Sequence, residues 1–273
     1  MAKFVKHWEG LFPPFRILSD LYFVGTQPAS SHIVKTSRGL IMLDSGYQHS
    51  LYAVIDNIYR VGLDPHDVKY LFITHGHIDH FGSARAIREL TGARIVIGRR
   101  DLDACTGKRE LSFARELDME FNETFEPDIL LDDGDVVTLG DVSIRAVATP
   151  GHTEGAMSYF FNICHMDKSY RVALHGGMGV NTLTEEYLTR YGLSFGLRED
   201  FRASMLRLAK EKVDVFLGNH MQHNNTPQRY ERLMAGDELA FYDDKAWGEY
   251  NLGVIGNLDK LIEKERIGKG GAK

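Results

Sequence analysis

The sequence predicts an α/β domain in which two β-sheets pack face to face and helices cover both outer sides. Segments rich in branched and aromatic residues alternate with helical patterns in two successive blocks of similar order. The chain has 273 residues, 43% of them hydrophobic, which is ample for one large core. No low-complexity linker separates the blocks, so residues 1–273 are interpreted as a single domain.

The first block begins with three short β-rich runs and continues as alternating helices and strands. Turn residues bound each run, and the first helical stretch repeats apolar residues at the spacing of one helix face. Such alternation places helices against at least part of a sheet. The expected strands are 21–25, 31–36, 39–46, 69–74 and 93–98, and the expected helices are 49–62 and 82–92, the second ended by Gly92.

A polar and charged segment, residues 99–126, separates the blocks. It is expected to form one or two short helices near the mouth of a cleft, either as a flap or as a solvated helical face. The end of the chain, residues 268–273, is rich in glycine and lysine and is expected to be a disordered tail. The second block predicts strands 135–140, 142–150, 157–163, 171–177 and 213–219, and helices 184–192, 197–211, 225–236 and 244–267.

Composition limits the partners and the location of the protein. A net charge of −6 argues against general binding to nucleic acid or to membrane surfaces, because both are polyanionic. No run approaches the roughly 18 apolar residues of a membrane span, and residues 1–15 lack the apolar core of a signal peptide. The chain as written is therefore expected to be cytoplasmic, or periplasmic or secreted if a natural leader has been removed. The two cysteines, Cys105 and Cys164, predict unpaired and partly buried thiols.

The stretch FITHGHIDHFG contains three histidines and an aspartate within six consecutive residues. In extended chain, residues i and i+2 point to the same side, so His75 and His77 project together. Asp79 and His80 come where the chain turns into a helix and face a slightly different point. One tetrahedral zinc ion could not take all four and keep a position open for substrate, whereas two neighbouring metal ions could.

Two later histidines provide the ligands that both metal ions would still lack. His152 follows a strand in TPGHTEG, and His220 follows another in FLGNHMQHN. His223 competes with His220 for the same role three residues on. The isolated histidines are interpreted as solvated or hydrogen-bonded side chains: His7, His49 and His66.

The motif THGHIDH resembles the His-x-His-x-Asp-His signature of the metallo-β-lactamase superfamily. IMLDSG, TPGHTEG and the late His220 follow in the order of that family, so the resemblance covers roughly residues 20–235. It implies an αββα sandwich with two Zn²⁺ ions at one edge. Asp44 of LDSG matches an aspartate that supports the metal loops without binding metal. The resemblance assigns the first zinc to His75, His77 and His152, and the second to Asp79, His80 and His220.

The residues at the end of strand 171–177 indicate the branch of the family. Glyoxalase II, lactonases and many phosphodiesterases carry an aspartate there that bridges both metals, and the largest lactamase subclass carries a cysteine; this chain reads LHGGMG. A set of five histidines and one aspartate resembles the third subclass of metallo-β-lactamases. Two departures stand out. Gly177 and Gly179 replace serines that often help to hold a substrate carboxylate, and Glu154 replaces the usual proline.

The resemblance implies a binuclear zinc hydrolase in which metal-bound hydroxide opens a cyclic amide such as a β-lactam. Asp79 would be catalytic as well as a ligand, because it can orient the hydroxide. The two zinc ions leave the site positively charged, which favours a small anionic substrate. Without the serines, β-lactam hydrolysis is expected to be weak and to improve on changing Gly177 to Ser.

Three other functions remain open. The first is a hydrolase of another ester, lactone or amide, with antibiotic cleavage as a side activity. The second is an iron-binding oxidoreductase of the same fold, which is disfavoured because such relatives need more carboxylate ligands. The third is a metal-stabilised binding protein. Among residues near the motifs, Tyr191, Asn181 and Asn219 are interpreted as surface hydrogen-bonding groups, and His175 as a core residue or a pocket-facing one.

Overall fold

The computed structural model describes residues 10–270, and side chains as far as residue 268. Two expectations from the sequence therefore cannot be compared with it. The first concerns residues 1–9, which include His7, and the second concerns residues 271–273. Both segments lie outside the described residues.

A seven-stranded sheet is built by the first half of the chain in sequence order. Its strands pair antiparallel from β1 to β4 and parallel from β4 to β7. The strands are β1 (Phe15–Leu18), β2 (Leu21–Phe23), β3 (His32–Thr36), β4 (Gly39–Leu43), β5 (Val68–Phe72), β6 (Arg94–Gly98) and β7 (Ile129–Leu131).

A five-stranded sheet is built by the second half, in the order β12-β11-β10-β9-β8. Its neighbours are antiparallel except for β11 and β12, which are parallel. The strands are β8 (Val136–Leu139), β9 (Val142–Ala148), β10 (Met157–His165), β11 (Lys168–Leu174) and β12 (Val215–Leu217).

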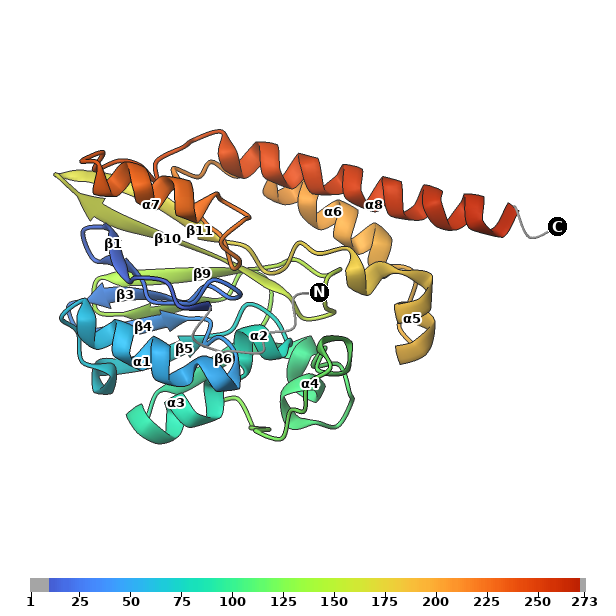
Figure 1. Cartoon of the computed structure of the whole chain (residues 1–273), viewed down its shortest axis with the longest axis horizontal. Helices are drawn as coiled ribbons and strands as arrows, with labels where there is room; N and C mark the ends of the chain where they lie inside the picture. Colours follow the sequence, from blue (N-terminus) through green and yellow to red (C-terminus); the bar gives the residue numbers. More distant parts are fainter. Residues whose placement is uncertain (1–9, 271–273) are drawn as a thin grey trace.

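Helices cover the outer face of each sheet (Figure 1). On one side lie α1 and α3, and on the other α6, α7 and α8, the last of which extends well beyond the body of the molecule. The expected αββα sandwich is therefore confirmed. Between residues 10 and 270, no helix is both long and apolar enough to cross a bilayer. The helices are α1 (Leu51–Arg60), α2 (Ile78–Phe81), α3 (Ala84–Thr91), α4 (Leu102–Thr106), α5 (Glu185–Tyr191), α6 (Leu197–Leu208), α7 (Thr226–Met234) and α8 (Ala246–Gly270).

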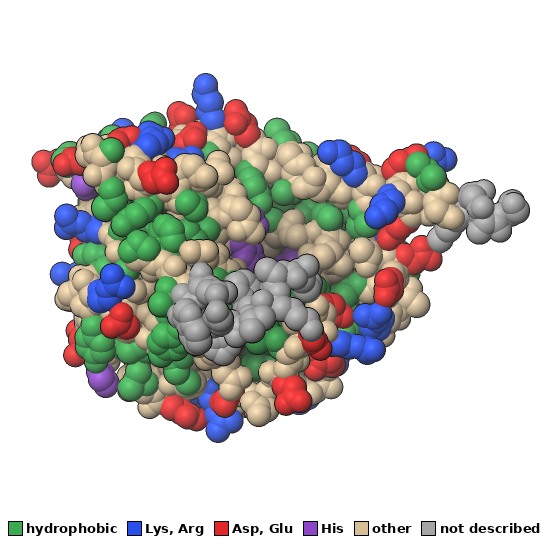
Figure 2. Space-filling model, viewed as in Figure 1, with side chains coloured by type: hydrophobic (Ala, Val, Ile, Leu, Met, Phe, Trp, Pro, Cys, Tyr) green, Lys and Arg blue, Asp and Glu red, His purple; other side chains and the backbone are tan. Residues whose placement is uncertain are grey.

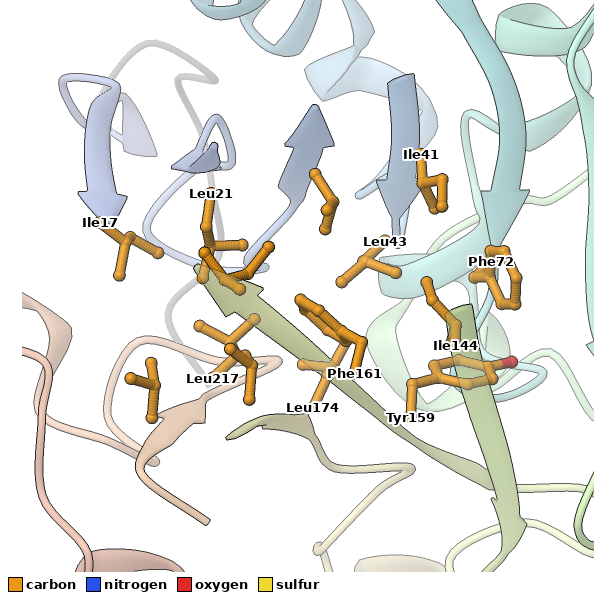
Figure 3. Packing of buried hydrophobic residues seen from close by; sticks show 14 of the residues in the cluster. Ile17, Leu21, Ile41, Leu43, Phe72, Ile144, Tyr159, Phe161, Leu174 and Leu217 are labelled. Carbon is orange, nitrogen blue, oxygen red and sulfur yellow. The ribbon is translucent and has the colours of Figure 1, made fainter. Parts of the chain in front are cut away.

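Three apolar clusters fill the spaces between these layers. The central one lies between the sheets, where Phe72 of β5 meets Tyr159 of β10 edge to face at 5.2 Å (Figure 3). Alternate residues of each strand point into it because side chains in a strand alternate between faces. The other two clusters join the seven-stranded sheet to α1 and α3, and the five-stranded sheet to α6 and α8.

The structure differs from the expected elements at a few places. β1 and β7 were not expected, because they are only four and three residues long and show little alternation. β4 ends at Leu43, three residues earlier than expected, because Asp44 takes a left-handed φ of 56°. Residues 268–270 were expected to be disordered and instead complete α8.

Candidate metal centre

The metal-type residues expected from the sequence come together at one edge of the sandwich. His75, His77 and the helix that carries Asp79 and His80 follow β5 of the larger sheet. The segments with His152 and His220 follow β9 and β12 of the smaller sheet. Figure 2 shows histidine side chains at the bottom of a hollow on this edge.

His75, His77 and His152 form one group. Each offers a ring nitrogen, and these atoms lie within 4.8 Å of one another. The ring centroids of His75 and His77 lie 4.7 and 4.6 Å, respectively, from the ring centroid of His152. All three side chains are buried. Three converging imidazoles with a free side make an ordinary site for a divalent metal.

Asp79, His80 and His220 lie directly beside this group. Asp79 Oδ2 is 3.3 Å from His80 Nε2 and 3.4 Å from His220 Nε2. His75 connects the two groups, because its ligand atom also lies within 4.8 Å of those of Asp79 and His80. His223, the competitor of His220, instead pairs through Nδ1 with Asn219 Oδ1 at 2.8 Å.

The residues present fit metal ions because buried ring nitrogens here lack ordinary partners. Among residues 10–268, the buried Nε2 atoms of His75 and His77 make no hydrogen bond. Leaving a buried polar atom unpaired costs roughly 1–3 kcal/mol. His80 Nε2 faces the Asp79 carboxylate at 3.3 Å without forming a well-aligned hydrogen bond. These ring nitrogens lie at one edge of the sandwich and are explained if they are metal ligands.

Asp44 fixes the orientation of the β5 loop. Its left-handed backbone turns the buried carboxylate toward that loop, where Oδ1 accepts the Thr74 amide at 2.7 Å and Oδ2 the Thr74 hydroxyl at 2.8 Å. Oδ2 also lies 2.8 Å from His80 Nδ1, and Thr74 Oγ1 lies 3.0 Å from His75 Nδ1. Partners on Nδ1 set the tautomer and leave Nε2 for the centre. Asp44 thus has the supporting position expected of it.

Backbone carbonyls orient the two histidines of the smaller sheet. His152 Nδ1 lies 2.8 Å from Gly179 O, and His220 Nδ1 lies 2.7 Å from Pro28 O. A carbonyl only accepts, so Nδ1 of each ring carries the proton. Each Nε2 is then an acceptor available to a metal.

The glycines after β11 are packed against His152. At Gly177, whose φ is 136°, a Cβ atom would lie 2.6 Å from His152 Cδ2. At Gly179 it would lie 2.3 Å from Asn181 Oδ1 and 3.0 Å from His152 Cε1. The expectation that Gly177→Ser improves activity is therefore abandoned, because a side chain there would displace His152.

Burial and neighbouring charges set the protonation of the histidines. Burial, with the other histidines adding to it, holds the pKa values of His75 and His77 well below 6.5, and burial lowers that of His152 to about 4. Burial also lowers the pKa of His80, but Asp79 and Asp44 outweigh it and raise that pKa to about 10. The first group is thus already in the neutral form that binds metal.

Segment 99–126 lies beside the cleft, as expected, and packs its inner side on the ligand loops, while many of its other residues are exposed. Ser112 O accepts the amide of Ile78 at 2.9 Å, directly after His77. The Phe113 ring packs 5.0 Å from the His77 ring and is held by a left-handed φ of 64°. The buried carboxylate of Asp101 accepts hydrogen bonds from both ligand loops. The sequence analysis singled out neither Asp101 nor Phe113. A signal was available for Asp101, because it lies three residues after the end of β6.

Other polar residues near the motifs have structural positions. His175 is fully buried: its Nδ1 accepts the Gly177 amide at 3.1 Å, and its Nε2 lies 3.1 Å from Asn251 Oδ1. Of the two positions expected for His175, it therefore has the one in the core and does not face the pocket. Asn219 is also buried and donates to His175 O, so its expected surface role is wrong. Tyr191 donates its hydroxyl to Glu116 at 2.6 Å.

Glu154, at the position of the expected proline, binds two arginines of segment 99–126. Its carboxylate lies 3.1 Å from Arg109 Nη1 and 3.3 Å from Arg100 Nη2. This pairing ties the His152 turn to segment 99–126.

The chain is similar to known proteins both in sequence and in structure. A family model described as the metallo-beta-lactamase superfamily matches residues 24–166, more than half of the chain. The structure resembles a subclass B3 metallo-beta-lactamase of Bradyrhizobium japonicum with a TM-score of 0.87 and 28% identity, covering 97% of this chain and 99% of that one. It resembles the native metallo-beta-lactamase of Legionella gormanii with a TM-score of 0.86 and 27% identity, covering 94% and 98%.

Curated relatives match over a shorter stretch. A probable metallo-hydrolase of Burkholderia pseudomallei is 38% identical over 98 residues, 36% of this chain and 33% of that protein. A hydroxyacylglutathione hydrolase of Maricaulis maris is 34% identical over 92 residues, 34% of this chain and 28% of the relative. The chain thus covers about a third of the length of these two relatives.

Proposed function

The chain belongs to the metallo-β-lactamase superfamily, and from that premise we propose that it is a hydrolase with two zinc ions that opens a cyclic amide. β-Lactam hydrolysis is proposed as a weak activity. The observation that carries the proposal is the cluster of six metal-type residues, in which the buried Nε2 atoms of His75 and His77 have no hydrogen-bond partner. Six ligands are more than one tetrahedral ion can use.

The two groups of the cluster divide the ligands. His75, His77 and His152 would hold the first ion, and the second would be held by Asp79, His80 and His220. Ions bound there would make water a nucleophile at neutral pH and polarise the carbonyl that it attacks. The neutral first group needs no proton loss to bind, whereas His80 must give up the proton that Asp79 and Asp44 stabilise.

Asp79 has a second role in this proposal. Its carboxylate is buried within 3.4 Å of His80 and His220, and a bound metal ion would keep it ionised. An ionised carboxylate is an acceptor, able to take a hydrogen bond from the attacking water and align it. No Ser-His or Cys-His pair is required.

A small cavity lies beside His77 and His152. Its walls are mostly apolar and come from segment 99–126 and from the α5–α6 region, with Leu111, Tyr187 and Leu193 among them. Its volume of about 20 Å³ has room for roughly one water molecule, so it does not indicate the size or class of the substrate. The preference for a small anionic substrate rests on the positive charge that two bound zinc ions would supply.

An alternative substrate class has its own support. Gly177 and Gly179 offer no hydroxyl groups to a β-lactam carboxylate, and a hydroxyacylglutathione hydrolase is among the relatives. A metallo-hydrolase of another ester, lactone or amide would keep the same metal chemistry with β-lactam cleavage as a side activity.

Metal analysis combined with a substrate panel tests both proposals. Protein saturated with zinc and freed of excess should contain two zinc ions per chain and should hydrolyse a chromogenic cephalosporin slowly. A stoichiometry that stays at one would contradict the binuclear site. Two ions with no lactam turnover, and turnover of a lactone or thioester, would favour the alternative.

A further inference from the structure

The buried carboxylate of Asp101 joins the two loops that carry the first group of ligands. It lies at the end of the 3₁₀ turn Arg99–Asp101, directly before α4. Oδ2 accepts the Gly76 amide at 2.7 Å and the Thr153 hydroxyl at 2.7 Å, and Oδ1 accepts the Gly155 amide at 2.8 Å. Gly76 stands between His75 and His77, and Thr153 follows His152.

The two loops leave little room for any other arrangement. A Cβ atom at Gly155 would lie 2.4 Å from Asp101 N, and one at Gly76 would lie 3.2 Å from Asp101 Cβ. Glycine at both positions lets the backbone approach the carboxylate closely. Both ligand motifs are therefore shaped around Asp101, although they come from different sheets.

The hydrogen bonds of Asp101 match an ionised carboxylate. It is about 5% exposed, and among residues 10–268 it forms no ion pair with lysine or arginine. An ionised carboxylate only accepts, and all three of its partners donate. Backbone amides and a hydroxyl thus compensate the burial of the carboxylate. In Asp101→Asn one carboxylate oxygen becomes an NH₂ group, and this donor would face a group that also donates.

We propose that Asp101 is a positioning residue for the first metal ion: it holds the His75–His77 strand end and the His152 turn at the separation that this ion requires. It binds neither metal nor substrate. The inference rests on the proposed zinc site and adds to it a residue outside the ligand set. Residues that orient metal ligands without touching the metal typically change affinity by about 10- to 100-fold.

Single-site backgrounds test which ion depends on Asp101. His220→Ala should leave a protein that binds one zinc ion through His75, His77 and His152. His152→Ala should leave one that binds through Asp79, His80 and His220. Zinc affinity is measured by competition with a chromophoric chelator. Asp101→Asn should weaken binding about 10- to 100-fold in the His220→Ala background and less than about twofold in the His152→Ala background.

A matched control makes the same substitution at a neighbouring aspartate. Asp103→Asn in α4, two residues away, should leave both affinities unchanged. Equal losses in the two backgrounds, or no loss in either, would overturn the inference. If the parent chain binds no zinc at all, the proposed function fails instead, so the two failures are distinct.

A second variant guards against a folding defect in Asp101→Asn. Thr153→Val removes one donor to Oδ2 and keeps the side-chain shape, and it should weaken zinc binding in the His220→Ala background by roughly 2- to 10-fold. Thermal unfolding of the metal-free proteins is measured in parallel. A lower melting temperature with unchanged zinc affinity for both variants would assign Asp101 to stability alone and overturn the inference.

Discussion

The backbone after β11 packs against one side of the His152 ring. This close packing explains Gly177 and Gly179, which replace the serines expected from the family resemblance. Serine at Gly177 would need a φ of 136° and would meet His152 Cδ2 at 2.6 Å. Neither the φ nor the close approach can be read from residue types, because both depend on how β11 ends against the turn after β9. The histidine cluster itself could be predicted, since its spacing is local.

Gly177→Ser should therefore impair the enzyme instead of improving it. Displacing His152 should lower affinity for the first zinc ion by about tenfold or more, and kcat/KM should fall with it. Gly192→Ser is the control, because Gly192 also has a positive φ, of 61°, but its Cβ atom would have no neighbour within 4 Å. Zinc titration of both variants measures the effect, and equal affinities would contradict it.

Asp79 and His175 should differ sharply when truncated. Asp79→Ala removes the carboxylate within 3.4 Å of two histidine nitrogens and the acceptor for the attacking water, so kcat should fall by more than about 100-fold. His175→Ala removes a buried ring bonded to Gly177 and Asn251, so its main loss should be in stability. Turnover at saturating zinc is compared with the urea midpoint. Equal losses of kcat would place His175 against the substrate.

At the scale of elements, the ends of β4, β5, β9 and β12 supply the centre. These strands were predictable, with their ends two or three residues too late, because each is a clear apolar run followed directly by a polar motif. β1 and β7 were not, since strands of four and three residues are defined by pairing with β2 and β6 and not by their own pattern. The burial of Asn219 was missed for a similar reason: it depends on β12 lying beside β11.

His32 on β3 makes stability depend on pH. Its ring is buried edge to face against Phe23, and burial lowers its pKa from 6.5 to about 3. Between these values the unfolded chain binds a proton at this residue and the folded chain does not. The stability that neutral His32 contributes is therefore present above pH 6.5 and is lost as pH falls toward 3, by up to about 1.4 kcal/mol per pH unit.

His32→Leu should remove this contribution. Urea unfolding of metal-free protein, compared at pH 7.5, 6 and 5, should give a wild-type free energy of unfolding that declines more steeply with acid than that of the variant. Other buried histidines titrate in both proteins, so the difference between them isolates His32. Parallel curves below pH 6.5 would mean that this ring is protonated in the folded state.

At the scale of the whole molecule, the sandwich brings segments distant in sequence to one edge. The two-block order of strands and helices was enough to predict the layers. It could not predict that segment 99–126 packs its inner side on the metal loops, because the buried contacts of Phe113 and Asp101 are with residues far along the chain. The same packing places Arg100 and Arg109 beside Glu154, close to the ligands.

This arrangement sets what a β-lactam would find in the site. Gly177 and Gly179 cannot donate side-chain hydrogen bonds to its carboxylate. Each such charge-assisted bond is worth roughly 1.5–3 kcal/mol, which corresponds to about a tenfold to hundredfold loss of affinity. A contact that is equally strong in the ground state and the transition state affects mainly KM. The positive charge of bound zinc ions would offset part of the loss, because long-range attraction needs no exact geometry.

We therefore expect measurable β-lactam hydrolysis with a high KM, and a KM that rises further with salt, since screening weakens long-range attraction. Steady-state kinetics on a penicillin and a carbapenem at two ionic strengths measure both effects. A KM in the low micromolar range would contradict the prediction and would mean that another group binds the carboxylate directly. Arg109→Ala then discriminates: if Arg109 is that group, its loss raises KM at least about tenfold with kcat little changed, because a uniform binding contact has been removed.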